Sequence, residues 1–174
     1  MSLDVRSGAF ALEDIPVVYT GDGRNISPPL EWTPGPPGTK SYALIMDDPD
    51  SPRGTWVHWV LWNIRDAGLP AQVACEPQVD TAFGRVSQGR NSYGRIGYSG
   101  PCQPAGTHRY FFKLYALDTE LDLAPETTKR DLVAAMATHI LDHGEMMVTH
   151  SRARAVAARL ASPEERVAKR PIQR

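Results

Sequence analysis

The chain has 174 residues, of which 41% are hydrophobic and 22% charged, and its formal net charge at pH 7 is −1. That length suits a single domain whose core needs no disulfide or metal to be stable. The charge excludes the basic field that recruits nucleic acid or an anionic membrane. No apolar run reaches the length of a membrane span, and the charged N-terminus does not fit a secretory signal peptide. We therefore expect a cytoplasmic protein, with Cys75 and Cys102 as two reduced thiols.

Turn-forming residues dominate residues 15–37, which predicts loop with short extended pieces, and repeated glycines predict loop again over residues 79–107. Between them lie two apolar runs. Residues 42–46 read as a buried strand that ends at the acidic turn 47–50, and residues 56–64 read as a central strand covered on both faces. Strict alternation along the second strand places His58 on a face with Trp56, Val60, Trp62 and Ile64.

A further strand is predicted over residues 109–117, with His108 and Tyr110 pointing to one side and Arg109 to the other. Arg109 is therefore better placed for a buried ion pair than for a pocket. After Pro125 the apolar period becomes helical, with one face made of Leu132, Val133, Met136, His139 and Ile140. We interpret His139 as a core histidine bonded to a backbone carbonyl.

Helix-start signals mark three positions in the last third of the chain. Thr128 with Asp131 reads as a capping box, residues 152–161 as a helix, and residues 162–165 as a new helix start. Strands first and helices last predict a mainly β or α+β fold. We divide the chain into a domain of residues 1–152 and a basic helical extension of residues 153–174.

Candidate site residues gather in the acidic turn, the strand that follows it and the glycine-rich segment before residue 108. Asp48 with His58 and His108 could serve as a metal site, since two imidazoles and a carboxylate are suitable ligands. A hydrolase is disfavoured because Pro101 stands where the nucleophile motif G-x-S-x-G needs glycine. Asp48 could orient His58, accept a hydrogen bond from a protonated phosphate, or meet an ammonium group.

Four motifs in this order resemble the phosphatidylethanolamine-binding protein family, and its bacterial Raf-kinase-inhibitor-like branch in particular: DPDSP (48–52), WVHW (56–59), GYSGPC (97–102) and HRYFFKLYALD (108–118). The resemblance implies a large antiparallel sheet, a smaller second sheet and C-terminal helices. Residues 139–141 and 144–146 are similar to that branch's C-terminal helix.

The resemblance also implies a small cavity that binds phosphate-type headgroups or similar anions, with no metal, no cofactor and no catalytic residue. Its lining would be Asp48, Pro52, Trp56, His58, Gly100, Pro101, His108 and Tyr110. Asp50 and Arg109 would support it from behind, and Asn91, Ser92 and Tyr93 could form its rim. Dimers occur among the bacterial members, so a homodimer is an open alternative. So is a protein-interaction module of the kinase-inhibitor type that the branch's name suggests.

Three residues depart from the branch's pattern. Gln103 stands where a second proline is usual, Thr138 replaces a glycine, and His150 takes the place of a tyrosine. The last change puts a pocket contact from that position in doubt, although a histidine could substitute as a donor.

Overall fold

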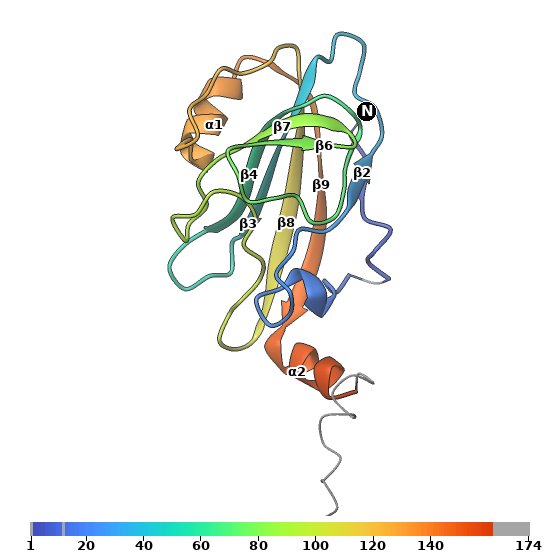
Figure 1. Cartoon of the computed structure of the whole chain (residues 1–174), viewed down its shortest axis with the longest axis vertical. Helices are drawn as coiled ribbons and strands as arrows, with labels where there is room; N and C mark the ends of the chain where they lie inside the picture. Colours follow the sequence, from blue (N-terminus) through green and yellow to red (C-terminus); the bar gives the residue numbers. More distant parts are fainter. Residues whose placement is uncertain (1, 12, 162–174) are drawn as a thin grey trace, which may run out of the picture.

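The computed structural model describes residues 2–11 and 13–161, and it is mainly β, as expected. Two antiparallel sheets, a three-stranded sheet in the order β1-β2-β5 and a six-stranded sheet in the order β6-β7-β4-β3-β8-β9, form its frame (Figure 1). The elements are β1 (Val5–Arg6), the 3₁₀ turn η1 (Val17–Tyr19), β2 (Leu30–Trp32), β3 (Ser41–Asp48), β4 (Trp56–Ile64), β5 (Gly68–Leu69), β6 (Gln78–Thr81), β7 (Gly84–Gln88), β8 (Thr107–Leu117), α1 (Lys129–Met136), β9 (Ile140–Ser151) and α2 (Arg152–Ala161).

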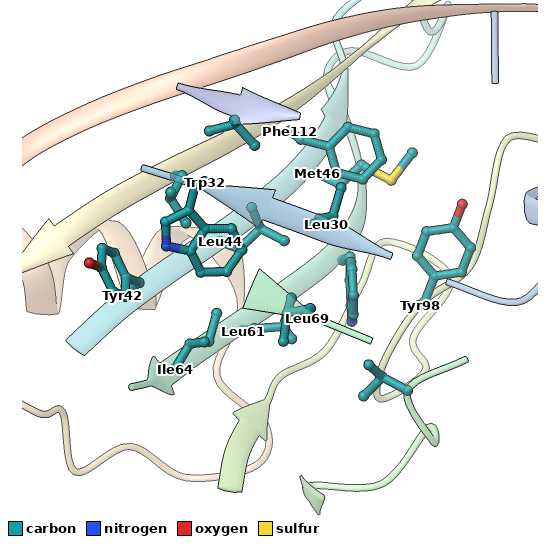
Figure 2. Close-up of a cluster of buried hydrophobic side chains, with 14 of the residues drawn as sticks. Leu30, Trp32, Tyr42, Leu44, Met46, Leu61, Ile64, Leu69, Tyr98 and Phe112 are labelled. Carbon is teal, nitrogen blue, oxygen red and sulfur yellow. The ribbon is translucent and has the colours of Figure 1, made fainter. Parts of the chain in front are cut away.

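The large sheet is covered on both faces, which explains why its central strands are apolar throughout. One face packs against the small sheet, and Figure 2 shows Leu30 and Trp32 of β2 over Leu44 and Leu61 of the large sheet. The other face packs against α1 and the segment before it. All eight residues of β3 are buried, as the sequence predicts for a central strand.

Two neighbouring carboxylates end β3, and alternation sends them to opposite faces of the sheet. Asp47 is fully buried on the α1 side, where its Oδ2 lies 3.1 Å from Lys113 Nζ and 2.6 Å from Lys129 Nζ. Lys113 comes from β8 and Lys129 from the first turn of α1. An unpaired charge in this position would cost several kcal/mol, so the two lysines tie α1 to the sheet.

The N-terminal segment runs beside β9, the outermost strand of the large sheet. The backbone N–H of Leu3 donates to the carbonyl of His143, that of Ile15 donates to Thr149, and that of Thr149 donates to Glu13. Gly144 lies where the Leu3 backbone crosses, and a Cβ there would be 1.9 Å from the Leu3 carbonyl oxygen. Only glycine fits such a close approach of two backbones.

Three expectations about secondary structure are wrong. Residues 140–151 form strand β9 rather than a C-terminal helix, because the helix ends at Met136. Residues 78–88 form the hairpin β6–β7 rather than loop. His139 is not in the core: its side chain is 39% exposed, and its Nδ1 lies 2.7 Å from the Asp118 carboxylate.

The helix predictions are confirmed at α1 and α2. Thr128 and Asp131 form the predicted capping box, and Leu132 and Met136 are buried. The predicted apolar face is wrong at Val133, which is exposed, and at Ile140, which is exposed and begins β9. α2 spans Arg152–Ala161 at one end of the molecule (Figure 1), with Ala155 buried and Arg154 paired with Asp14. The helix start expected at 162–165 lies outside the described residues.

Both cysteines are free thiols in the structure. No helix in the described part of the chain is long and apolar enough to cross a membrane.

The capping box gives a direct test of how α1 is held. We expect Thr128→Ala to lower the free energy of unfolding by about 1 kcal/mol, because it removes the side chain that accepts from the Asp131 N–H. Urea unfolding followed by circular dichroism measures the change. Thr138→Ala, at an exposed position just beyond the helix, is the matched control and should change stability by less than about 0.5 kcal/mol. Equal effects of the two substitutions would contradict the capping role.

Candidate functional site

A pocket of about 330 Å³ opens where the end of β3, the start of β4 and the start of β8 meet the loop after residue 99. Its lining residues are Asp48, Ser51, Pro52, Arg53, Trp56, His58, Tyr93, Cys102, Gln103, Pro104, His108 and Tyr110. Six of the eight predicted lining residues are thus brought together; Gly100 and Pro101 do not line it. Of the predicted rim, Tyr93 reaches the pocket, and Asn91 and Ser92 do not.

Sequence reasoning missed five further lining residues: Ser51, Arg53, Cys102, Gln103 and Pro104. All five lie within two residues of the motifs DPDSP (48–52) and GYSGPC (97–102) or inside them. The only sequence signal for these five residues was their position beside predicted lining residues in the acidic turn and the glycine-rich segment. Position alone does not tell which neighbouring side chains point into the pocket.

A β-bulge positions His58. The pairing of β3 with β4 shifts between Met46–Trp59 and Asp47–Val57, so His58 has no partner across the strands. A bulge of this kind breaks strict alternation. His58 and Trp59 consequently lie on the same side of the sheet: the His58 ring is 5.3 Å from the Tyr110 ring, and Trp59 packs in the core shared with the small sheet. The expected shared face of His58 with Val60 and Trp62 is wrong.

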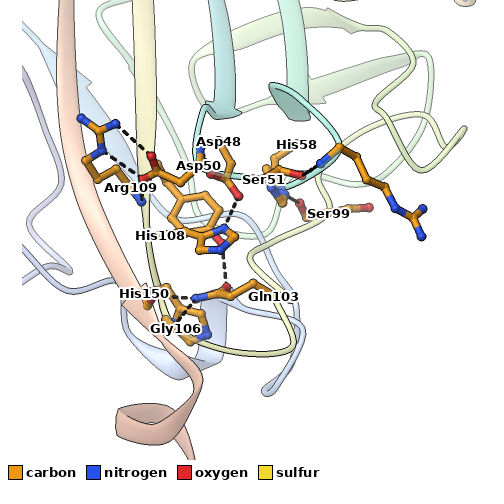
Figure 3. Close-up of polar contacts among 12 residues, drawn as sticks. Asp48, Asp50, Ser51, His58, Ser99, Gln103, Gly106, His108, Arg109 and His150 are labelled. Carbon is orange, nitrogen blue, oxygen red and sulfur yellow. Dashed lines mark hydrogen bonds and ion pairs between the residues drawn. The ribbon is translucent and has the colours of Figure 1, made fainter.

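Asp48 is bonded to His108 rather than to His58. Asp48 Oδ2 lies 2.7 Å from His108 Nδ1, and its Oδ1 accepts the backbone N–H of Asp50 at 2.8 Å (Figure 3). The carboxylate is only 4% exposed. Because a carboxylate accepts, Nδ1 of His108 carries the proton, and Nε2 is left as the ring nitrogen available to a ligand.

His58 is held by a backbone carbonyl. Its Nδ1 lies 2.6 Å from the Ser99 carbonyl oxygen, which can only accept, so Nδ1 carries the proton here as well. Burial lowers the pKa of His58 below its ordinary value, and the Ser99 carbonyl and the Asp48 charge offset this only in part. His58 is therefore neutral at pH 7 with Nε2 as an acceptor. The nearby carboxylates do raise the pKa of His58, but burial has the larger effect.

Arg109 points away from the pocket, as alternation along β8 predicts. It pairs with Asp50 in a two-pronged contact of 3.0 Å and 2.9 Å, and its backbone N–H donates to the same carboxylate at 2.8 Å. Arg109 holds the pKa of Asp50 at about 2. The predicted ion pair is present, but it is not buried, because the Arg109 side chain is 54% exposed. The ion pair attaches the acidic turn to β8 on the side away from the pocket.

The glycine-rich segment shapes the loop behind the pocket and supplies no free N–H at Gly100. That N–H donates to Asn25 Oδ1 at 2.7 Å. A Cβ on Gly100 would lie 2.2 Å from the Tyr19 carbonyl oxygen, so the residue is fixed by packing. Asn91 braces the same loop from within, donating to the Gly97 carbonyl and to Ser99 Oγ.

Gln103, the departure from the branch's proline, is buried in the pocket wall. Its Nε2 donates to the carbonyl of His150 at 2.5 Å and faces that of Gly106 at 3.5 Å, while its Oε1 accepts the Tyr110 hydroxyl at 2.7 Å (Figure 3). The side chain of His150 does not reach the pocket. It is buried with Nε2 3.4 Å from Asp22, and burial lowers its pKa.

The metal alternative finds no support in the geometry. Within residues 2–11 and 13–161, no group of three or more His, Cys, Asp or Glu side chains is arranged to hold a metal ion. Asp48 and His108 are bonded to each other, and His58 keeps its Nδ1 on a carbonyl.

Comparison with known proteins gives consistent matches. A family model described as phosphatidylethanolamine-binding protein matches residues 7–151. A UPF0098 protein of Methanothermobacter thermautotrophicus is 49% identical over 142 residues, covering 79% of this chain and 91% of the relative. A UPF0098 protein of Pyrococcus horikoshii is 43% identical over 155 residues, covering 87% of this chain and 78% of the relative.

Two solved structures share the fold. A phosphatidylethanolamine-binding protein homologue from Chlamydia trachomatis has a TM-score of 0.77 at 35% identity, and the match covers 87% of this chain and 98% of that one. E. coli YbcL, described as a new member of the mammalian PEBP family, has a TM-score of 0.77 at 27% identity, with 87% and 99% covered.

The protonation state of His58 can be checked by NMR. We expect its pKa to lie below the value of about 6.5 found in unfolded chains, with Nδ1 protonated in the neutral ring, because burial opposes the charged form. Since the unfolded chain then binds the proton more readily, His58 should reduce stability progressively as the pH falls below about 6.5. Titration of the ring resonances gives the pKa and tautomer. A pKa above 6.5 would overturn this assignment.

Gly100 should be required for packing rather than for ligand contact. We expect Gly100→Ala to destabilise the fold by about 1–3 kcal/mol, since the new Cβ must displace the Tyr19 backbone. Gly8→Ala is the control, because nothing lies within 4 Å of a Cβ at that position. Chemical unfolding of both variants measures the difference, and a Gly100→Ala protein as stable as the control would refute the packing role.

Proposed function

The chain belongs to the phosphatidylethanolamine-binding protein family, and we propose that its pocket binds a small anionic ligand of the phosphate or phospholipid-headgroup type without chemical turnover. The observation that carries the proposal is the pair of imidazoles, His58 and His108, whose Nδ1 atoms are both occupied by protein acceptors. Each ring thereby keeps Nε2 for a ligand in a pocket about 330 Å³ in volume. A phosphate or a small headgroup fits such a space.

Two donors in the pocket wall support an anionic ligand. Trp56 Nε1 is buried and has no hydrogen-bond partner among the described residues. A buried donor left without an acceptor costs about 1–3 kcal/mol, so an acceptor at this position would be stabilising. Arg53 lines the same pocket from an exposed position and supplies the positive charge.

The surroundings favour binding over chemistry. Ser99, the serine of the glycine-rich segment, is buried outside the pocket and its Oγ accepts a hydrogen bond from Asn91. A serine nucleophile needs its oxygen exposed and bonded to a base. We therefore propose a regulatory protein that is not an enzyme. The cytoplasm is its proposed location, which two exposed free thiols support, and a homodimer remains a proposal.

Binding of inorganic phosphate and phosphoethanolamine tests the function. We expect both to shift the ring resonances of His58 and His108, and His108→Asn to weaken binding about tenfold, the equivalent of one charge-assisted hydrogen bond. The asparagine amide keeps a donor for Asp48 but lacks the second ring nitrogen. Calorimetry gives the affinities, and unfolding curves confirm that the variant is folded.

His143→Ala is the matched control, since His143 is exposed on β9 and outside the pocket. It should leave the affinity unchanged. An unchanged spectrum at millimolar ligand would reject anion binding, and release of phosphate from phosphoethanolamine, followed by ³¹P NMR, would favour the enzyme alternative.

A further inference from the structure

The pocket has an unusual hydrogen-bonding polarity: the groups at its base are acceptors. His58 Nε2 is an acceptor because Nδ1 donates to Ser99. The Asp48 carboxylate can only accept. His108 donates from Nδ1 to Asp48, which leaves its Nε2 as the ring nitrogen that faces a ligand. An oxyanion that carries no hydrogen would meet lone pairs at His58 Nε2 and at the Asp48 carboxylate.

Gln103 extends this polarity to the hydroxyl of Tyr110. The orientation of the Gln103 amide is fixed, since its nitrogen faces two carbonyl oxygens that only a donor can satisfy, those of His150 and Gly106. Its oxygen must then receive the Tyr110 proton at 2.7 Å. Tyr110 is thereby left with only lone pairs to offer to the pocket. A proline at position 103 would have no side-chain acceptor and would leave this hydroxyl free to donate.

We propose that Gln103 is a positioning residue that makes the pocket selective for a phosphate monoester bound as its protonated monoanion, whose P–OH donates to the acceptors at the base. The inference rests on the proposed anion-binding function and narrows its ligand class. The remaining phosphate oxygens are left for the wall of the pocket, which Trp56 and Arg53 line. A phosphodiester or a sulfate, which has no proton to donate at neutral pH, is disfavoured.

We assign the proton of the hydrogen bond between the ligand and His58 to the ligand, because the surroundings of His58 favour the neutral imidazole. Burial lowers the pKa of His58, and a phosphate monoester has its second pKa near about 6, within reach of neutral pH. The titratable and charged groups that share the pocket with the ring are Asp48, Arg53, Tyr93, Cys102, His108 and Tyr110, and Asp47 acts on it from the opposite face of the sheet. The carboxylates among them interact favourably with a proton brought by the ligand.

Calorimetry with methyl phosphate, dimethyl phosphate and sulfate tests the proposal at pH 7.5 in two buffers of different ionisation enthalpy. We expect methyl phosphate to bind at least about tenfold more tightly than either other anion, as one lost hydrogen bond to a charged group implies. Binding should also take up nearly one proton per methyl phosphate, because the ligand is mostly a dianion in solution at this pH.

Gln103→Leu frees the Tyr110 hydroxyl to donate, so it should reduce the preference for methyl phosphate over sulfate to less than about threefold. Gln78→Leu, on the exposed edge strand β6, is the control and should keep the wild-type ratio. If Gln103→Leu does not fold, Tyr110→Phe removes the same acceptor and should narrow the ratio in the same direction. A ratio that is unchanged in the folded variant overturns the role of Gln103.

The outcomes distinguish selectivity for the phosphate monoanion from anion binding itself. Equal binding of all three anions to the wild-type protein, with or without proton uptake, overturns the selectivity and leaves anion binding in place. Binding of none of the three rejects anion binding and the inference together. Tight methyl phosphate binding without proton uptake at pH 7.5 shows that the dianion binds, and it overturns the proposal.

Discussion

Burying two adjacent carboxylates at the end of a central strand is the constraint on which both faces of this protein depend. Asp47 and Asp48 are each less than 5% exposed, and alternation sends them to opposite sides of the large sheet. Each needs its own partner, because a buried charge without one is costly. On one side the partners are two lysines, one of which begins α1. On the other side the partner is His108, and the pocket forms around that pair.

The hydrogen-bonding groups of the pocket therefore depend on Asp48 at the end of β3. Asp48 fixes the tautomer of His108, and the bulge opposite the end of β3 turns His58 towards Tyr110. Gln103 then determines which way the Tyr110 hydroxyl donates. Family resemblance describes where such a pocket lies, but the residue that departs from the pattern determines the direction of one of its hydrogen bonds.

Much of the frame could be predicted from the sequence, for identifiable reasons. The faces of β8 followed from alternation, and the double burial of β3 followed from its unbroken apolar run. Alternation failed at His58 because a bulge changes the register without leaving a local sign in the residues. The hairpin of β6 and β7 was missed because its strands are short and mostly polar at their exposed positions. The role of Gly100 depends on the distant Tyr19 backbone, which no local pattern reveals.

The N-terminal segment beside β9 has a consequence for the molecule as a whole. β9 is twelve residues long and lies at the edge of the large sheet, with Leu141 and Met147 exposed along it. An open edge of that length is a template for pairing with another chain. The contacts of Leu3 and Ile15 occupy part of it, and Gly144 gives the crossing backbone its room. Leu3, Glu13 and Ile15 therefore leave less of the β9 edge open to pairing with another chain.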